Sequence, residues 1–72
     1  MIIEVFAEEP QVIKINLYNV MGSKVYEYTE KIETASEFSH TIPTEYLNSG
    51  IMIIHVEANG QLYHQKISGN LK

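Results

Sequence analysis

The sequence predicts a small all-β protein, an antiparallel β-sandwich of six to seven short strands. Apolar and polar residues alternate with a period of two along several short runs, which is the pattern of strands with one buried face. Glycine, asparagine and proline interrupt these runs at short intervals, and no helical spacing extends beyond one turn. The 72 residues suffice for a single domain, residues 1–72, with a thin core.

The first two strands are predicted at residues 2–6 and 12–18. The polar segment 7–10 ends the first strand, and the second strand has the clearest alternation in the chain. One face of the second strand is apolar and consists of Ile13, Ile15 and Leu17. The opposite face consists of Lys14, Asn16 and Tyr18. We therefore expect the apolar face to lie in the core.

The segment Asn19–Gly22 predicts a type I turn followed by a glycine bulge, because asparagine favours the first turn position and glycine accepts the left-handed one. This turn sets the register of the next strand. The predicted pairs are Leu17–Val25, Asn16–Tyr26, Lys14–Tyr28 and Ile15–Glu27. The last pair places a glutamate on the apolar face, a conflict that a β-bulge or a strand end outside the core would resolve.

The same register gathers Tyr18, Tyr26 and Tyr28 on one outward face. That face, with Lys14 and Asn16 beside it, could bind sugar rings or a partner protein. Tyrosine is also common in strands because of its packing alone. An ordinary sheet face is therefore the alternative interpretation.

Residues 30–36 are polar and are predicted to form a loop. One face of the short strand that follows carries Phe38, His40 and Ile42. Pro43 ends this strand because proline cannot donate a ladder hydrogen bond. Residues 44–49 are predicted to form a single irregular turn, with Leu47 as its inward anchor.

The end of the chain carries the strongest local signal. Asn59-Gly60 lies between two period-two runs, residues 51–58 and 61–67, and a type I′ hairpin turn needs two consecutive residues at positive φ. A two-residue turn also determines the register of the hairpin. The predicted pairs are Val56–Tyr63, His55–His64, Ile54–Gln65 and Met52–Ile67.

Few side chains suggest chemistry. His55 and His64, with Glu57 diagonal to them, could bind a transition metal, but two solvent-facing histidines without a third strong ligand are the more ordinary interpretation. His40 could act as a general base or be a partly buried histidine, and no carboxylates are paired for acid–base work. The chain has no cysteine, and its four glycines are isolated. We therefore expect no enzyme, no cofactor and no metal.

The net charge of −4 disfavours nucleic acid and anionic membranes as partners, because both attract basic faces. No apolar run reaches the roughly 18 residues that span a bilayer, so we expect no membrane insertion. The first residues lack the basic and apolar regions of a signal peptide. If the domain is exported, its export signal is expected elsewhere in a longer parent protein.

Three segments follow one another at characteristic spacings. Residues 18–25 read Tyr-Asn-Val-Met-Gly-Ser-Lys-Val, and Ile42 is followed by Leu-Asn-Ser-Gly-Ile-Met at residues 47–52. The closing hairpin then ends in Lys66 and Ile67. Together these segments resemble the C-terminal sorting domain, type A-like, of the type IX secretion system, the Por system of Bacteroidetes. The chain departs from that family in lacking its opening Pro-Asn-Pro, in having Met52 in place of a tyrosine, and in continuing through residues 68–72.

The resemblance implies a seven-stranded Ig-like sandwich that forms the C-terminal part of a longer secreted cargo protein. The outer-membrane secretion and sorting machinery would recognise it, and the cargo would travel through the periplasm to the cell surface or the exterior. A sortase-type peptidase would commonly remove the domain while attaching the cargo to lipopolysaccharide. By alignment to the family motif, the expected recognition positions are Gly22 and Gly50, which hold turns, and Lys66 and Ile67 at the end of the last strand.

Two other classes of function stay open. The chain could be a small exported adhesion module that binds glycan or protein through the tyrosine face, or a structural sandwich that spaces another domain. Unpaired edge strands would also allow a weak homodimer.

Overall fold

The computed structural model describes residues 1–47 and 50–68, and in these residues it confirms the all-β prediction. The described strands are β1 (Ile2–Ala7), β2 (Gln11–Asn19), β3 (Lys24–Ile32), β4 (Ser36–Thr41), β5 (Ile51–Ala58) and β6 (Gln61–Ser68). A 3-10 turn at Thr44–Tyr46 precedes β5 and confirms the predicted irregular turn. Asn48 and Ser49 of that prediction lie outside the described residues, as do residues 69–72.

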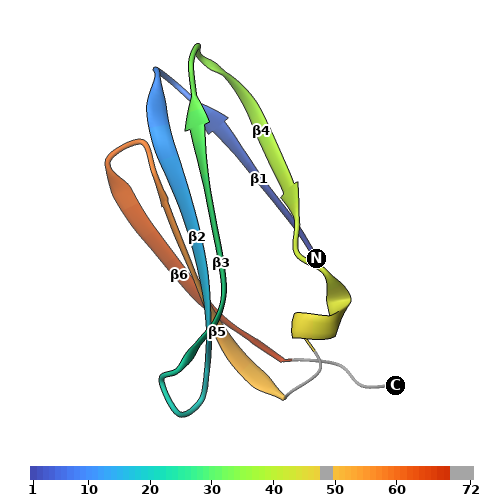
Figure 1. The fold of residues 1–72 in the computed structure, drawn as a ribbon. Coiled ribbons are helices and arrows are strands. Elements are labelled where there is room, and N and C mark those ends of the chain that lie inside the picture. Colours follow the sequence, from blue (N-terminus) through green and yellow to red (C-terminus); the bar gives the residue numbers. More distant parts are fainter. Residues whose placement is uncertain (48–49, 69–72) are drawn as a thin grey trace.

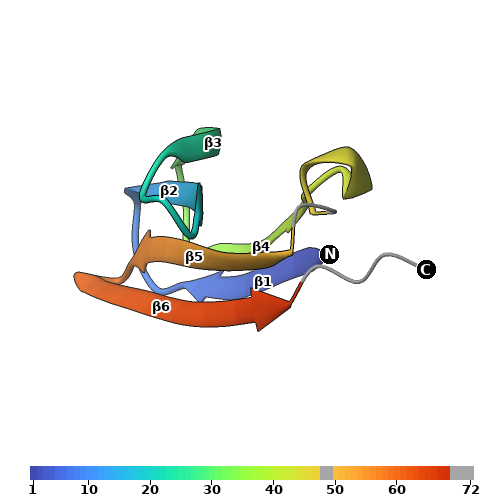
Figure 2. The same ribbon diagram turned by 90° about the horizontal axis from the view of Figure 1, so that it is seen from below.

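The strands form two antiparallel sheets that pack as a small sandwich (Figures 1 and 2). Within residues 1–47 and 50–68, one sheet has the order β3-β2-β5-β6 and the other consists of β1 and β4. The core between them consists of Ala7, Ile13, Ile15, Leu17, Ile32, Phe38, Ile42, Met52, Ile54, Val56 and Ala58. Because two described strands face four, the described part of the smaller sheet covers the larger one incompletely.

The alternation of β2 explains its central place. Ile13, Ile15 and Leu17 are fully buried, and β2 pairs with β3 on one side and β5 on the other. The β2–β5 pairing sets Leu17 opposite Ile54, so it joins two apolar faces that are far apart in the sequence. The strands β2 and β5 together supply most of the buried residues of the larger sheet.

The predicted β2–β3 turn is confirmed. The N–H of Gly22 donates to the carbonyl of Asn19 at 3.0 Å, and Gly22 has a φ of 85°. The Oδ1 of Asn19 accepts the N–H groups of Met21 and Ser23, each at 3.0 Å. Asparagine at the first turn position therefore holds the turn through its side chain as well as its backbone.

All four predicted β2–β3 pairs are wrong, although the predicted turn is present. Tyr18 opposes Lys24 as the turn requires, but the register shifts before the next pair and Leu17 opposes Tyr26 instead of Val25. Val25 is thus the extra residue of a β-bulge. Because a shift of one residue reverses the faces of a strand, Glu27 leaves the apolar face and lies opposite Asn16.

The predicted loop at residues 30–36 is also wrong in its extent. β3 continues to Ile32, and β4 already begins at Ser36. After the bulge, every second residue of β3 points toward the smaller sheet. The last of these is Ile32, which is 7% exposed and lies opposite Gln11. Burial of this apolar side chain extends the strand through a stretch whose local composition is polar.

The closing hairpin has the predicted turn and register. Asn59 and Gly60 have φ values of 53° and 74°, as a type I′ turn requires. The observed pairs include Met52–Ile67, Ile54–Gln65, His55–His64 and Val56–Tyr63. The face shared by Phe38, His40 and Ile42 is confirmed, with Phe38 and Ile42 buried, and Leu47 packs against the core.

Candidate functional site

The three tyrosines of the predicted binding face do not share one face. Tyr18 lies on the outer face of the larger sheet, where its ring centroid is 5.0 Å from that of His55. Tyr26 and Tyr28 oppose the buried Leu17 and Ile15, so they point toward the smaller sheet. The bulge at Val25 causes this separation, since it places the two β3 tyrosines on the inner side.

The inner tyrosines form a row of contacting rings between β3 and β4. We call this row the aromatic seam; it consists of Tyr26, Tyr28, His40 and Tyr46. The hydroxyl of Tyr26 lies 2.6 Å from the Nε2 of His40, and the rings of His40 and Tyr28 stack with centroids 3.8 Å apart. Tyr26 also packs against Tyr46 at 4.8 Å. The seam therefore closes one long side of the sandwich, and its rings contact one another.

Tyr28 is held in its neutral form at the end of this seam. Its hydroxyl donates to the Oε1 of Glu30 at 2.5 Å. That hydrogen bond, with smaller contributions from burial and from the negative charge of Glu30, raises the pKa of Tyr28 above its ordinary value. His40, considered above as a general base, has a tyrosine hydroxyl as its hydrogen-bond partner.

The two histidines of the hairpin meet as predicted but acquire no third ligand among the described residues. His55 and His64 lie opposite each other on the outer face, with ring centroids 5.7 Å apart. Glu57, the expected diagonal neighbour, instead approaches the Nζ of Lys14 at 4.0 Å. Two histidines alone provide half of a tetrahedral metal site.

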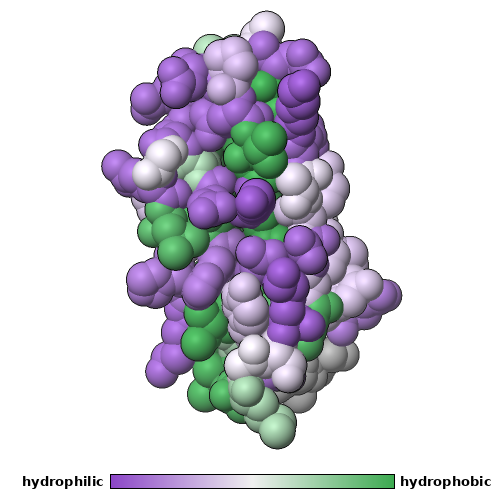
Figure 3. All heavy atoms as spheres, turned by 60° about the vertical axis from the view of Figure 1, so that its left-hand side comes forward, coloured by the Kyte–Doolittle hydropathy of each residue, from purple (hydrophilic) through white to green (hydrophobic). Residues whose placement is uncertain are grey.

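Apolar side chains gather at the end of the larger sheet that carries the β2–β3 turn. We call this surface the turn-end patch; it consists of Val20, Met21 and Ile51, which are 67%, 85% and 44% exposed, with the half-buried Tyr18 and Ile53. In Figure 3 apolar residues gather at the lower end of the molecule, where Figure 1 places this turn and the start of β5. A shallow hollow of about 190 Å³ runs along the patch between Val20 and Ile53.

Two of the four predicted recognition positions lie beside the turn-end patch. Gly22 lines the shallow hollow, and Lys66 is exposed on the outer face directly opposite Ile53. The other two have structural surroundings. Gly50 has a φ of 90°, and Ile67 is half-buried opposite Met52 on the inner face.

The family described as the secretion system C-terminal sorting domain matches residues 2–69, nearly the whole chain. The chain belongs to this family of type IX secretion sorting domains. Comparison with curated proteins and with solved structures found no match. Sorting domains of this kind act as signals for a secretion system, and the family is not a catalytic one.

Sequence reasoning about this sorting domain missed the turn-end patch. Val20 and Met21 occupy the two central positions of a turn, where local geometry asks for no apolar side chain. Two large apolar residues at such exposed positions were a signal of an interaction surface.

Within the described residues no helix is both long and apolar enough to cross a membrane.

Proposed function

We propose that this chain is the C-terminal part of a longer secreted protein and that the type IX translocon recognises it to export the cargo through the periplasm to the cell surface. The family match over residues 2–69 carries this proposal. The six described strands support it, because a folded domain can present a constant surface on unrelated cargo proteins. A sortase-type peptidase would then remove the domain and attach the cargo to lipopolysaccharide.

The turn-end patch, together with Lys66, is the surface we assign to recognition. Exposed apolar patches on small domains commonly mark protein contacts, and a cation beside such a patch adds specificity and a faster encounter. Lys24 pairs with Tyr18 on the same side of the sheet, so a lysine lies on each side of the patch. An acidic groove lined with apolar residues on the machinery would complement this surface.

The four predicted recognition positions take different roles in this proposal. Lys66, exposed on β6, would contact the machinery directly. Gly22 and Gly50 would preserve the turns that shape the patch, because both adopt positive φ. Ile67 would hold the end of β6 against the core, where it packs on the buried cluster.

Export can be tested with a fusion protein. Residues 1–72 are placed after a signal peptide and a fluorescent reporter and expressed in a bacterium with an intact type IX system. We expect the reporter at the cell surface or in the medium. A reporter that stays in the periplasm of this strain, but is folded and uncleaved, would contradict the sorting role.

Point variants in the same fusion test the assigned surface. Lys66→Ala and Met21→Ser are expected to reduce export while leaving the melting temperature within a few degrees, since both side chains are exposed. Lys31→Ala is the matched control, because Lys31 is an exposed lysine on the opposite edge strand. Equal export by Lys66→Ala and Lys31→Ala would leave the sorting role intact and refute the assigned surface.

The alternative of an adhesion module stays a prediction. It was based on a shared tyrosine face, and the inward position of Tyr26 and Tyr28 leaves Tyr18 alone on the outer side. The sorting role therefore accounts for more of the observed surface.

A further inference from the structure

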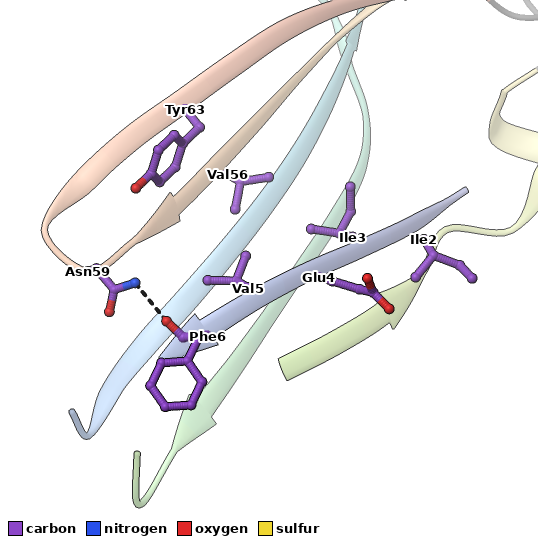
Figure 4. Close-up of a pocket in the computed structure, with 8 residues that line it drawn as sticks. All are labelled: Ile2, Ile3, Glu4, Val5, Phe6, Val56, Asn59 and Tyr63. Atoms are coloured by element: carbon purple, nitrogen blue, oxygen red, sulfur yellow. Dashed lines mark hydrogen bonds between the residues drawn. The ribbon is translucent and has the colours of Figure 1, made fainter. Parts of the chain in front are cut away.

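In the part of the chain that the structure describes, no strand covers the side of the sandwich opposite the aromatic seam. There β1 forms one edge of the smaller sheet, because β4 is its only partner among the described strands. A hollow of about 430 Å³ runs along this edge and is lined by residues 2–6 of β1, by Val56, by Asn59 and by Tyr63 (Figure 4). A second hollow of about 280 Å³ continues from it and shares Ile3, Val56 and Tyr63.

The register shows which peptide groups of β1 face this groove. The N–H of Ile42 donates to the carbonyl of Met1 at 2.8 Å, so the odd-numbered residues of β1 direct their peptide groups toward β4. The peptide groups of Ile2, Glu4 and Phe6 therefore point to the open edge. An edge of this kind is a template for a further strand.

The side chain of Asn59 already pairs with the far end of this edge. Its Nδ2 donates to the carbonyl of Phe6 at 2.9 Å, and its Oδ1 accepts the N–H of Glu8 at 3.0 Å. The side-chain amide thus occupies the carbonyl of Phe6 and the N–H of Glu8, two edge groups that a neighbouring strand would otherwise bond. It marks where a strand along β1 would stop and leaves the peptide groups of Ile2 and Glu4 for the incoming segment.

The floor of the groove is apolar and only partly covered. Val5 and Val56 line the hollow from different strands (Figure 4), and Tyr63, which is 49% exposed, extends the floor onto β6. Side chains of an added strand that lie opposite Ile3 and Val5 would point inward and cover this floor, because directly opposed residues share a face. The side chain opposite Glu4 would point outward.

We propose that the β1 edge binds an extended segment of a partner protein as an additional antiparallel strand. The segment carries aliphatic residues at the inward positions and a lysine or arginine opposite Glu4. This mode of binding combines main-chain hydrogen bonds for affinity with alternate side chains for specificity. The inference rests on the geometry of the groove and is independent of the sorting role.

Charge favours a basic partner over a second copy of this chain. Glu4, Glu8 and Glu9 are all exposed along or just beyond the edge, and the chain carries a net charge of −4. Two copies pairing through β1 would bring like charges into opposition, which is destabilising. A lysine opposite Glu4 replaces that repulsion with an attractive cross-strand pair.

The probe is the peptide acetyl-Ser-Val-Lys-Val-Lys-Val-Ser-amide, titrated into the isotope-labelled domain and followed by NMR. We expect chemical-shift changes at Ile2, Glu4 and Tyr63. Hydrogen exchange at the Glu4 amide is expected to be fast in the free domain and slow with the peptide, while Ile3 and Val5 are protected in both. A matched peptide with N-methyl groups on its edge-facing residues should bind at least about tenfold more weakly, as expected when main-chain bonds supply the affinity.

A charge exchange tests the role of Glu4. Glu4→Lys is expected to weaken binding of the lysine peptide by about two- to tenfold, because one attractive cross-strand charge pair becomes repulsive. The same variant is expected to strengthen binding of a peptide in which glutamates replace the two lysines, because a repulsive pair becomes attractive. Glu33→Lys, an exposed position in the β3–β4 connection, is the control and should change neither.

The proposal is overturned if the lysine peptide produces no shifts at millimolar concentration, or if the N-methylated peptide binds equally well. It is likewise overturned if the shifts lie away from β1. Sedimentation that shows a dimer, with the Glu4 amide protected from exchange in the absence of peptide, would assign the edge to a second copy instead. Export of the fusion protein is not involved in any of these results, so failure here and failure of the sorting role are distinguishable.

Discussion

Replacing Asn59 by glycine would test whether one side chain fastens the closing hairpin to the rest of the sandwich. Asn59 lies at the tip of the β5–β6 hairpin. Its Oδ1 accepts from the N–H of Glu8 at 3.0 Å and from the Nε2 of Gln11 at 2.9 Å, and its Nδ2 donates to the carbonyl of Phe6 at 2.9 Å. These bonds connect the hairpin to the β1–β2 connection, which is more than 45 residues away in the sequence.

The expected loss of folding stability in Asn59→Gly follows from these three hydrogen bonds. A hydrogen bond contributes about 0.5–1.5 kcal/mol net, and the bonds to Glu8 and Phe6 are exposed, so values near the lower end apply. Glycine adopts the φ of 53° without strain, and the backbone N–H of residue 59 keeps its bond to the Oε1 of Gln11. We therefore expect a loss of about 2 kcal/mol, or roughly 8–16 °C in melting temperature for a domain of this size.

The assay is urea and thermal unfolding followed by far-UV circular dichroism and tyrosine fluorescence. Asn59→Asp is the matched variant, because it keeps both accepted bonds and the turn but loses the donor to Phe6; an intermediate loss of about 1 kcal/mol is expected. Exchange at the Glu8 amide should accelerate in the glycine variant and stay slow in the aspartate variant. A glycine variant as stable as the original chain would refute the reasoning and show that the turn conformation alone holds the hairpin.

Three further predictions concern the seam and the first turn. Tyr26→Phe removes the bond to the Nε2 of His40 but keeps the ring contacts, so unfolding in urea should show a loss of about 1 kcal/mol; no change would mean that stacking alone closes the seam. Glu30→Ala removes the acceptor of the Tyr28 hydroxyl and the nearby negative charge, which are causes of the raised pKa of Tyr28, so absorbance titration at alkaline pH should show one tyrosine titrating closer to its ordinary value, and an unchanged titration would contradict the assigned cause. Because the folded state holds this phenol proton more tightly than the unfolded state, the stability due to Tyr28 is full below the ordinary pKa of 10.0 and is lost as the pH rises through the folded value. Gly22→Ala should cost about 1–2 kcal/mol through its φ alone, since no atom lies within 4 Å of an added Cβ; D-alanine at the same position, made by chemical synthesis, should be tolerated, and equal losses for both would indicate a steric cause instead.

The β2–β3 hairpin shows why local signals go only so far. Asparagine and glycine specified its turn, and Tyr18 pairs with Lys24 as that turn requires. The bulge at Val25 has a cause that is not local. Without the bulge, Glu27 would lie on the face where Ile15 and Leu17 are buried against the other sheet. The conflict was visible in the sequence, but its resolution depended on what packs against β3.

The placement of the tyrosines followed from that one shift. Tyr26 and Tyr28 moved to the inner face and met His40 of β4, a strand of the other sheet. A period-two pattern shows which residues share a face. It cannot show which of two faces is buried where tyrosine, glutamate and threonine alternate, because none of these side chains has a strong preference for the core.

By itself the sequence determined the local features of this protein: the alternating strands, both asparagine–glycine turns, the register of the closing hairpin and the family motif. These depend on φ preferences and on side-chain period, which act between residues close together in the chain. The tertiary structure alone decided the β2–β5 pairing, the bulge at Val25, the aromatic seam and the open β1 edge. Each of these depends on which distant surfaces meet, and the free energy of burying them outweighs the weak local preferences of the segments involved.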